Sequence, residues 1–306
     1  MKFLRLIVFL CSVVFIFHLQ SCAPESDPVV AKATHLYFSD FSGKRIGVVD
    51  VNAIGSFTTL ADEADGLDTV SGIAVDFQGG RIYAVEELKN RVVRVHLDGS
   101  GSREVLYEEA DGVLEPTAVA FDPATSNLYW ANSGTGQFKK GSMDGTGVID
   151  TLYDGAEVIS YCYGLTIDPK SNSLFFSDFG DFSGIWVANL DGTGTPGRAS
   201  FPSFSIQNPA GLYLDVKTYR LYWADEGLGE ICTGTVSAQT ASIVFNYEDG
   251  INQADGIAVD IGSGKIYWTE PDKKTIMRGN IDGTGTPEVI LEDVESYSIV
   301  LKFDNQ

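Results

Sequence analysis

A four-residue motif that begins with an aromatic residue and ends with an acid or amide recurs six times in this chain of 306 residues. The copies are YFSD at 37, YAVE at 83, YWAN at 129, FFSD at 175, YWAD at 222 and YWTE at 267. Their starting points lie 45 to 47 residues apart. Such a regular period predicts one supersecondary unit repeated along the chain, with each unit burying its apolar faces against its neighbours.

Each repeat is predicted to contain four short strands. A segment that ends in aspartate comes before the motif, as in GLTID ending at Asp168, and a third strand comes after it, as in RVVRVHLDGSG at 91–101. An Asp-Gly pair closes the third strand in four repeats, because glycine accepts the positive φ of a tight turn. No segment shows sustained helical periodicity. The sequence therefore predicts an all-β fold, a six-bladed β-propeller of four-stranded antiparallel blades.

The propeller explains why Tyr267 and Trp268 stand side by side, although a strand with one wet face would alternate apolar and polar residues. Both faces of a middle strand are buried in a propeller, so we expect one ring to pack against each neighbouring blade. The acid or amide that ends each motif is expected to accept hydrogen bonds from backbone N–H groups of the following turn. The segment at 299–304 is expected to pair with the motif strand at 35–40 and close the ring.

The motifs and the DGTG turns resemble the YWTD, or class B, repeats of low-density lipoprotein receptors. The resemblance covers residues 35–304, although YAVE lacks the second aromatic residue and the repeats at 37 and 222 lack the DGTG turn. It implies a six-bladed propeller and a role in binding protein ligands.

The N-terminal segment has the features of an export signal. Lys2 and Arg5 precede an apolar run from Leu6 to Phe17 that is too short to span a bilayer. The segment resembles a bacterial lipoprotein signal, which implies lipid attachment at Cys22; the alternative is an ordinary secretory signal with a chance cysteine. We therefore expect a signal peptide at 1–21, a lipid-anchored tether at 22–33 and the propeller at 34–306. The expected location is the bacterial cell envelope, at the outer membrane or cell surface.

The charge of the chain limits its partners. Residues 1–21 contain two basic and no acidic residues, so their removal changes the net charge from −21 to −23. This balance argues against nucleic acid and against anionic lipid headgroups as ligands, and membrane contact is expected through the lipid anchor only. A monomer is expected. Cys162 and Cys232 are expected on an inner and an outer strand of neighbouring blades, as buried free thiols.

The candidate ligand site lies at the face formed by two sets of loops, those that lead into the innermost strands and those that connect second to third strands. Six aromatic residues fall on these loops, and flat rings with polar edges suit protein side chains or glycans. The alternative is that several of them fold back to plug the channel. The six candidates are Tyr161, Tyr163, Phe179, Phe182, Tyr297 and Phe41.

The inventory of catalytic groups argues against most propeller enzymes. Only three histidines exist, with His18 in the signal and His35 and His96 on predicted strands, so lyase-type and quinoprotein-type chemistry that depends on histidine has no match. A serine nucleophile lacks an imidazole partner. No catalytic residue and no required cofactor is therefore expected.

Two alternatives to a binding propeller stay open. A carboxylate- and calcium-dependent hydrolase or lactonase of the gluconolactonase-like type could use acids of the loop face, with Asp178 and Asp181 as the metal candidates, although DFGDFSG lacks the full spacing of a calcium loop. The other alternative is a structural scaffold subunit of an envelope complex.

Overall fold

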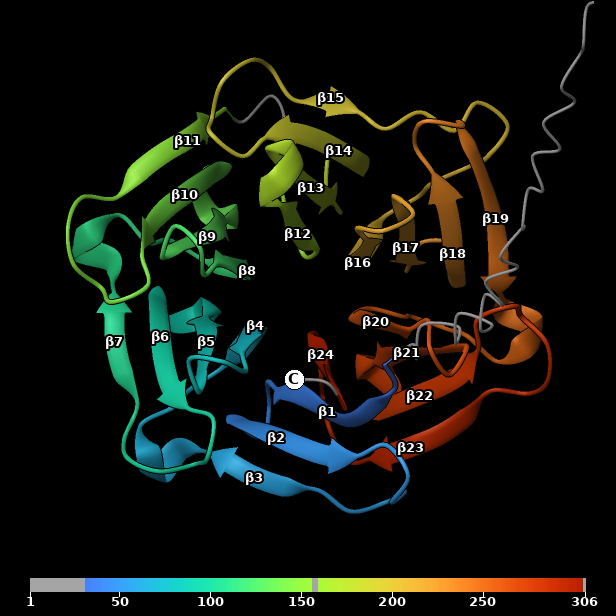
Figure 1. Cartoon of the computed structure of the whole chain (residues 1–306), viewed down its shortest axis with the longest axis horizontal. Coiled ribbons are helices and arrows are strands. Elements are labelled where there is room, and N and C mark those ends of the chain that lie inside the picture. The colour runs from blue at the N-terminus through green and yellow to red at the C-terminus, as the bar shows by residue number, and fades with distance from the viewer. Residues whose placement is uncertain (1–30, 156–158, 305–306) are drawn as a thin grey trace, which may run out of the picture. The chain divides into compact units, whose positions relative to one another are not determined.

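The computed structural model describes residues 31–155 and 159–304. In this part of the chain, 24 strands form six four-stranded antiparallel sheets, and no α-helix is present. The sheets stand as blades around one axis, with β4, β8, β12, β16, β20 and β24 innermost (Figure 1). The predicted six-bladed propeller is confirmed.

Each blade places its four strands in order from the axis outward. Blade 1 has β24 (Ile299–Phe303), β1 (Ala33–Asp40), β2 (Arg45–Asp50) and β3 (Thr58–Ala61). Blade 2 has β4 (Val70–Asp76), β5 (Arg81–Glu86), β6 (Arg91–His96) and β7 (Glu104–Tyr107). Blade 3 has β8 (Pro116–Asp122), β9 (Asn127–Asn132), β10 (Gln137–Ser142) and β11 (Asp150–Asp154).

The other three blades follow the same order. Blade 4 has β12 (Leu165–Asp168), β13 (Ser173–Asp178), β14 (Gly184–Asn189) and a short β15 (Gly197–Arg198). Blade 5 has β16 (Pro209–Asp215), β17 (Arg220–Asp225), β18 (Glu230–Thr235) and β19 (Thr240–Phe245). Blade 6 has β20 (Ile257–Asp260), β21 (Lys265–Glu270), β22 (Thr275–Asn280) and β23 (Glu288–Glu292).

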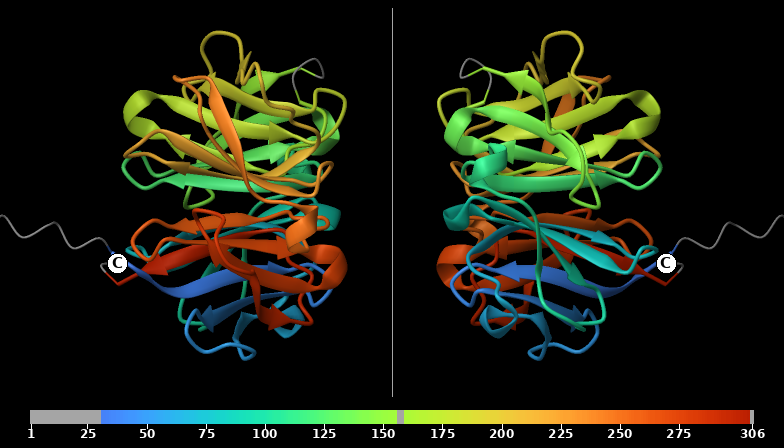
Figure 2. Two further views of the ribbon diagram at one scale, coloured as in Figure 1. Left: turned by 90° about the vertical axis from the view of Figure 1, so that its right-hand side faces the viewer. Right: turned by 90° about the vertical axis from the view of Figure 1, so that its left-hand side faces the viewer.

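Short 3-10 helices lie in the connections between strands, and these connections gather at the two faces of the ring (Figure 2). We call one of these the loop face: it carries the loops that lead into the innermost strands and the loops that join second to third strands. All but η5 belong to the loop face. The helices are η1 (Glu63–Asp65), η2 (Glu87–Lys89), η3 (Glu109–Asp111), η4 (Ser133–Thr135), η5 (Pro169–Ser171), η6 (Tyr247–Asp249) and η7 (Pro271–Lys273).

Strand β24 closes the ring, as predicted. It pairs antiparallel with β1, with Leu36 opposite Leu301 and Phe38 opposite Ile299. These four side chains are buried in one cluster that also contains Tyr267 of blade 6. Blade 1 is thus assembled from the first and the last strands of the described chain.

The adjacent aromatic residues of β21 pack on opposite sides of their sheet. Tyr267 and Trp268 expose 1% and 0% of their surface. Tyr267 packs with residues of blade 1, whereas Trp268 packs with Tyr222 and Ala224 of blade 5. One ring therefore faces each neighbouring blade, which confirms the prediction from the sequence.

Neighbouring blades approach each other closely near the loop face. A Cβ atom added to Gly211 of β16 would lie 2.4 Å from the carbonyl oxygen of Asp255 in the next blade, and one added to Gly164 would lie 2.5 Å from the Ala210 oxygen. Hydroxyl groups also bridge blades, since Ser39 Oγ donates to the Ser71 oxygen at 3.1 Å. Close backbone contacts and hydrogen bonds therefore join neighbouring blades, in addition to the clusters of buried side chains.

Both cysteines of the described part are buried and free, as expected. Cys162 lies in the loop before β12 rather than on an inner strand, while Cys232 lies on β18, the third strand of blade 5. No helix in the described residues is long and apolar enough to cross a membrane. The predicted signal peptide, Cys22 and all of the tether before residue 31 lie outside the described residues.

Candidate functional site

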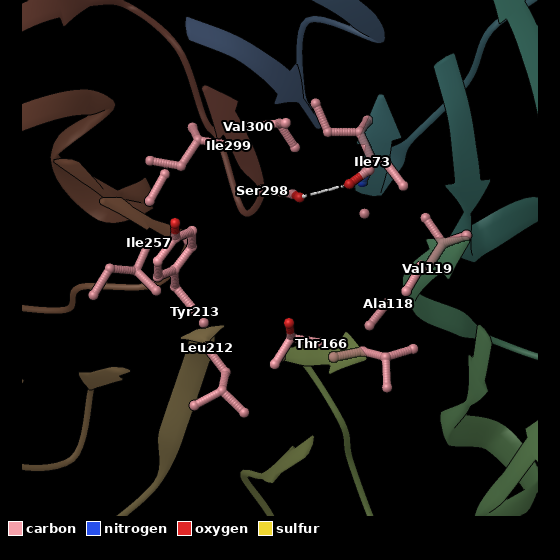
Figure 3. A pocket seen from close by; sticks show the side chains of 18 of the residues that line it. Ile73, Ala118, Val119, Thr166, Leu212, Tyr213, Ile257, Ser298, Ile299 and Val300 are labelled. Carbon is pink, nitrogen blue, oxygen red and sulfur yellow. Dashed lines mark hydrogen bonds between the residues drawn. The ribbon is translucent and has the colours of Figure 1, made fainter. Parts of the chain in front are cut away.

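A cavity of about 300 Å³ occupies the axis of the ring, lined by the innermost strands. Apolar side chains such as Val119, Leu212 and Ile257 dominate its wall, and Figure 3 shows them together with Thr166 and Tyr213. Burial raises the pKa of Tyr213 to about 12, so its phenol stays neutral at physiological pH. The cavity provides few polar groups that could act on a bound molecule.

Five of the six predicted aromatic residues meet at the loop-face end of this cavity. Tyr163 contacts Tyr161 at 5.1 Å, Phe179 at 5.4 Å and Tyr297 at 6.2 Å between ring centroids. Phe41 joins them edge-on to Tyr297 at 5.5 Å. We call Phe41, Tyr161, Tyr163, Phe179 and Tyr297 the aromatic cluster. All five are half-buried, so each keeps some accessible surface.

The aromatic cluster spans the ring. Tyr163 precedes β12 of blade 4 and Tyr297 precedes β24 of blade 1, and these two strands lie on opposite sides of the axis (Figure 1). The two rings are nearly parallel, at 11°, and both line the cavity. Tyr161 also crosses the ring, since its hydroxyl donates to Glu87 of blade 2. The cluster thus spans the mouth of the channel, as the plugging alternative expected, although none of its rings is fully buried.

Phe182 lies on the same loop as Phe179 but makes no ring contact with the cluster in the described structure. Its carbonyl oxygen accepts a hydrogen bond from the Trp186 indole at 3.1 Å. The prediction that the aromatic residues of this loop form one patch therefore fits Phe179 better than Phe182.

The acids that end three of the motifs tie two loops together. Asp178 accepts from the backbone N–H of Ser160 at 2.5 Å and of Gly180 at 3.0 Å. Asp40 accepts in the same way from Gly43 and Glu295, and Asp225 accepts from Gln207 and Leu228. Each carboxylate therefore fixes the turn after its motif to the loop that enters the same blade.

The prediction of turn caps is wrong for the other three motifs. Asn132 and Glu270 instead accept from the indole of the tryptophan two residues earlier, at 3.0 and 3.3 Å, because side chains two apart on a strand share a face. Glu86 accepts from Asp68 N–H in the loop that enters its blade, at 2.8 Å. Burial raises the pKa of Glu86, and it raises that of Asp225 to about 7. Glu86 and Asp225 therefore serve to hold loops in place.

The described residues contain no group of three or more His, Cys, Asp or Glu side chains arranged to hold a metal ion. Asp178, one of the two calcium candidates, already accepts three backbone N–H groups and the Ser160 hydroxyl. Asp181, the other candidate, is exposed on the loop. The two predicted acids therefore do not converge on a common point.

The histidines lie away from the loop face. His35 pairs with Asp50 at the end of β1 opposite to Asp40, and His96 pairs with Arg81 at the corresponding end of β6. No other histidine belongs to the described residues. The aromatic cluster therefore has no imidazole near it.

Sequence reasoning missed one buried acid at the mouth of the channel. In each blade, one residue precedes the glycine or small residue that packs on the next blade. These residues are Ser71, Thr117, Tyr163, Ala210, Asp255 and Tyr297. Asp255 is the only charged residue among them. Aligning the six copies at this position, rather than at the motif, would have found it.

The comparisons with known proteins support a YWTD-type six-bladed propeller. No protein-family model matches the sequence. Low-density lipoprotein receptor-related protein 8 of Gallus gallus is 31% identical over 81 residues, which are 26% of this chain and 9% of that receptor. This chain therefore matches a small part of that relative's length.

Two solved structures show the same fold. A chain in the crystal structure of a nidogen/laminin complex has a TM-score of 0.75 and 17% identity, over 87% of this chain and 97% of that one. A catalytically inactive histidine-to-alanine variant of virginiamycin B lyase from Staphylococcus aureus, with quinupristin, has a TM-score of 0.56 and 15% identity, over 83% and 73%. At these identities the likeness concerns the fold alone.

Proposed function

We propose that this propeller binds a protein ligand on its loop face without catalysing a reaction. The aromatic cluster carries the proposal: five half-buried rings from two opposite blades form one rigid surface over the channel mouth. Rigid aromatic residues are the side chains that most often dominate protein interfaces. The likeness to a lipoprotein receptor-related protein and to a nidogen/laminin complex supports a protein ligand over a polysaccharide.

Lyase chemistry is not proposed, although a lyase shares the fold. A histidine-to-alanine variant of that lyase is catalytically inactive, and the loop face of this chain has no histidine within the described residues. The alternatives are calcium-dependent hydrolysis and a scaffold role. Hydrolysis of an ester or lactone by the purified domain, abolished by a calcium chelator, is the result that would replace binding by catalysis.

The test of the binding face is a double substitution in the aromatic cluster. We expect Tyr163→Ala with Phe179→Ala to weaken binding of the natural partner by about 30-fold, since truncating an interface anchor costs about 2 kcal/mol. Pull-down from an envelope extract with a soluble form beginning at Ala23 identifies the partner, and titration measures the affinity. Phe182→Ala serves as the matched control, because it removes the same ring from the same loop outside the cluster. Equal affinity of all three proteins would refute the proposed face.

We also propose that the propeller is attached to the bacterial envelope through a lipid on Cys22, as a monomer at the outer membrane or cell surface. An acyl group supplies the membrane affinity that an acidic domain lacks. We expect Cys22→Ser to move the protein from the membrane fraction to the soluble fraction, whereas Cys11→Ser, within the signal segment, leaves it in the membrane fraction. Continued sedimentation of Cys22→Ser with membranes in high salt would contradict the anchor.

A further inference from the structure

Asp255 is a buried acid that the blade does not use. Its side chain lies in the loop that leads into β20 and only 3% of the residue is exposed. Its backbone N–H donates to the Thr269 oxygen at 2.9 Å, but the carboxyl atom Oδ1 has no hydrogen-bond partner. A buried carboxylate without a partner is costly, because it loses its hydration and gains nothing in return.

The groups that face Asp255 are acidic or aromatic. Glu226, on the turn between β17 and β18, and Glu87 of η2 across the ring both disfavour the ionised form of Asp255. Tyr163 and Tyr297 are also close, since the Asp255 charge contributes to raising the pKa of both phenols. No basic side chain in residues 31–155 or 159–304 forms an ion pair with any of these three acids. Burial and the two neighbouring acids raise the pKa of Asp255 well above its usual range, so the protein by itself favours the protonated carboxyl. A cation from another molecule would favour the ionised form and supply the missing partner.

Two observations show which kind of cation fits this site. Aromatic rings attract organic cations placed over their faces, and Tyr163 and Tyr297 line the cavity together with Gly256, the residue that follows Asp255. A metal ion needs several converging ligands, and the described residues offer no group of three that could hold one. A lysine ammonium or an arginine guanidinium can use one carboxylate together with aromatic faces.

We infer that Asp255 and the tyrosines beside it form a subsite for a cationic side chain of the protein ligand. The subsite lies where Tyr163 and Tyr297 cover the channel mouth, and its Oδ1 atom accepts the hydrogen bond of an inserted lysine or arginine. This inference rests on the proposed function and adds the chemistry of the partner to it. The repeat itself supports a ligand role, because Ser71, Thr117 and Ala210 occupy the same position in other blades without a charge.

The experiment measures binding of capped tripeptides to the soluble domain at low salt and pH 8. The probes are acetyl-Gly-Lys-Gly-amide, acetyl-Gly-Arg-Gly-amide and the neutral acetyl-Gly-norleucine-Gly-amide, with calcium chloride alone as a fourth. We expect a cationic peptide to bind the wild type at least tenfold more tightly than the norleucine peptide does. Binding is measured by titration, with tyrosine fluorescence as the signal. Asp255→Asn and Asp255→Ser should abolish this preference. Asp181→Asn, which removes the same charge from an exposed place on the same face, should retain it.

Stability separates a ligand role from a structural one. Removal of an unpartnered buried carboxyl should leave the melting temperature of Asp255→Asn unchanged or raise it, whereas a structural acid would lower it. The inference is overturned if no cationic peptide is preferred, if the preference survives in both Asp255 variants, or if calcium binds at Asp255 and the peptides do not.

The natural partner distinguishes this inference from the proposed function. If Asp255→Asn captures the partner as well as the wild type does, while Tyr163→Ala with Phe179→Ala loses it, the face is correct and the cation subsite is wrong. If all variants capture the partner equally, the proposed function itself is wrong.

Discussion

Deletion of residues 299–306 is expected to unfold most of the propeller at 37 °C. The deletion removes β24, whose side chains Ile299 and Leu301 are buried against β1 and blade 6. Loss of two such aliphatic side chains costs about 2 to 5 kcal/mol each, and a whole domain is stable by only about 5 to 15 kcal/mol. The loss also leaves β1 with an unpaired edge, which favours aggregation. A thermal melt monitored by circular dichroism measures the change in melting temperature.

A peptide added in trans provides the control for this deletion. A synthetic peptide of residues 297–306 should restore the melting transition, because an extended peptide can replace the missing strand at an open sheet edge. A scrambled peptide of the same composition should not. An unchanged melting temperature in the deletion variant would show that β24 does not hold the ring together.

Gly211→Ala is expected to destabilise the domain by about 3 kcal/mol, the upper part of the range for an overpacked site. The added Cβ would lie 2.4 Å from the Asp255 carbonyl oxygen and 2.9 Å from the Gly256 Cα. Both neighbours are backbone atoms of the next blade, so neither can rotate out of the way. Blades 5 and 6 therefore have to move apart at this junction to make room for the added methyl group. Chemical denaturation measures the change in the free energy of unfolding.

Gly197→Ala is the matched control for this substitution. Gly197 lies on the short outer strand β15, where an added Cβ has no neighbour within 4 Å. We expect its free energy of unfolding to change by less than about 0.5 kcal/mol. A comparable loss in both variants would mean that contact between the blades does not explain the result, since the lower entropy of the unfolded chain would by itself stabilise an alanine variant. Blade 3 carries Ala118 at the position of Gly211, so the requirement belongs to each junction separately.

The period of the motif was enough to predict the architecture, because six copies at nearly equal spacing leave few ways to bury the aromatic residues of every copy. It predicted the closing strand and the burial of Tyr267 and Trp268 on opposite sides of β21. It predicted the use of the last residue for three motifs only. Asn132 and Glu270 accept from the tryptophan on their own strand, whereas Asp225 caps its turn and the indole of Trp223 has no hydrogen-bond partner among the described residues.

The candidate site could be predicted only in part. Loop positions placed Tyr163 and Tyr297 on one face, but their contact across the axis depends on the width of the channel, which the sequence does not state. Phe182 was grouped with Phe179 by proximity in sequence. In the described structure its carbonyl oxygen accepts from the Trp186 indole, and it makes no ring contact with the aromatic cluster. Asp255 was missed because the motif drew attention to the second strand, whereas this acid precedes the first.

The position of β1 determines how the ring carries mechanical force. A pull on the residues before Ala33 enters the ring at a strand that is hydrogen-bonded on both sides, to β2 and to β24. Lys32 and Asp304 add two bonds at this point, and the Ala33 N–H donates to Asp260 of blade 6 at 2.9 Å. The hydrogen bonds of β1 to both β2 and β24 therefore have to break before β1 detaches. An outermost strand is hydrogen-bonded to one neighbour only and would detach more easily. Tension applied at this end therefore acts on blade 1 through both of its ladders and on blade 6 through the bond to Asp260.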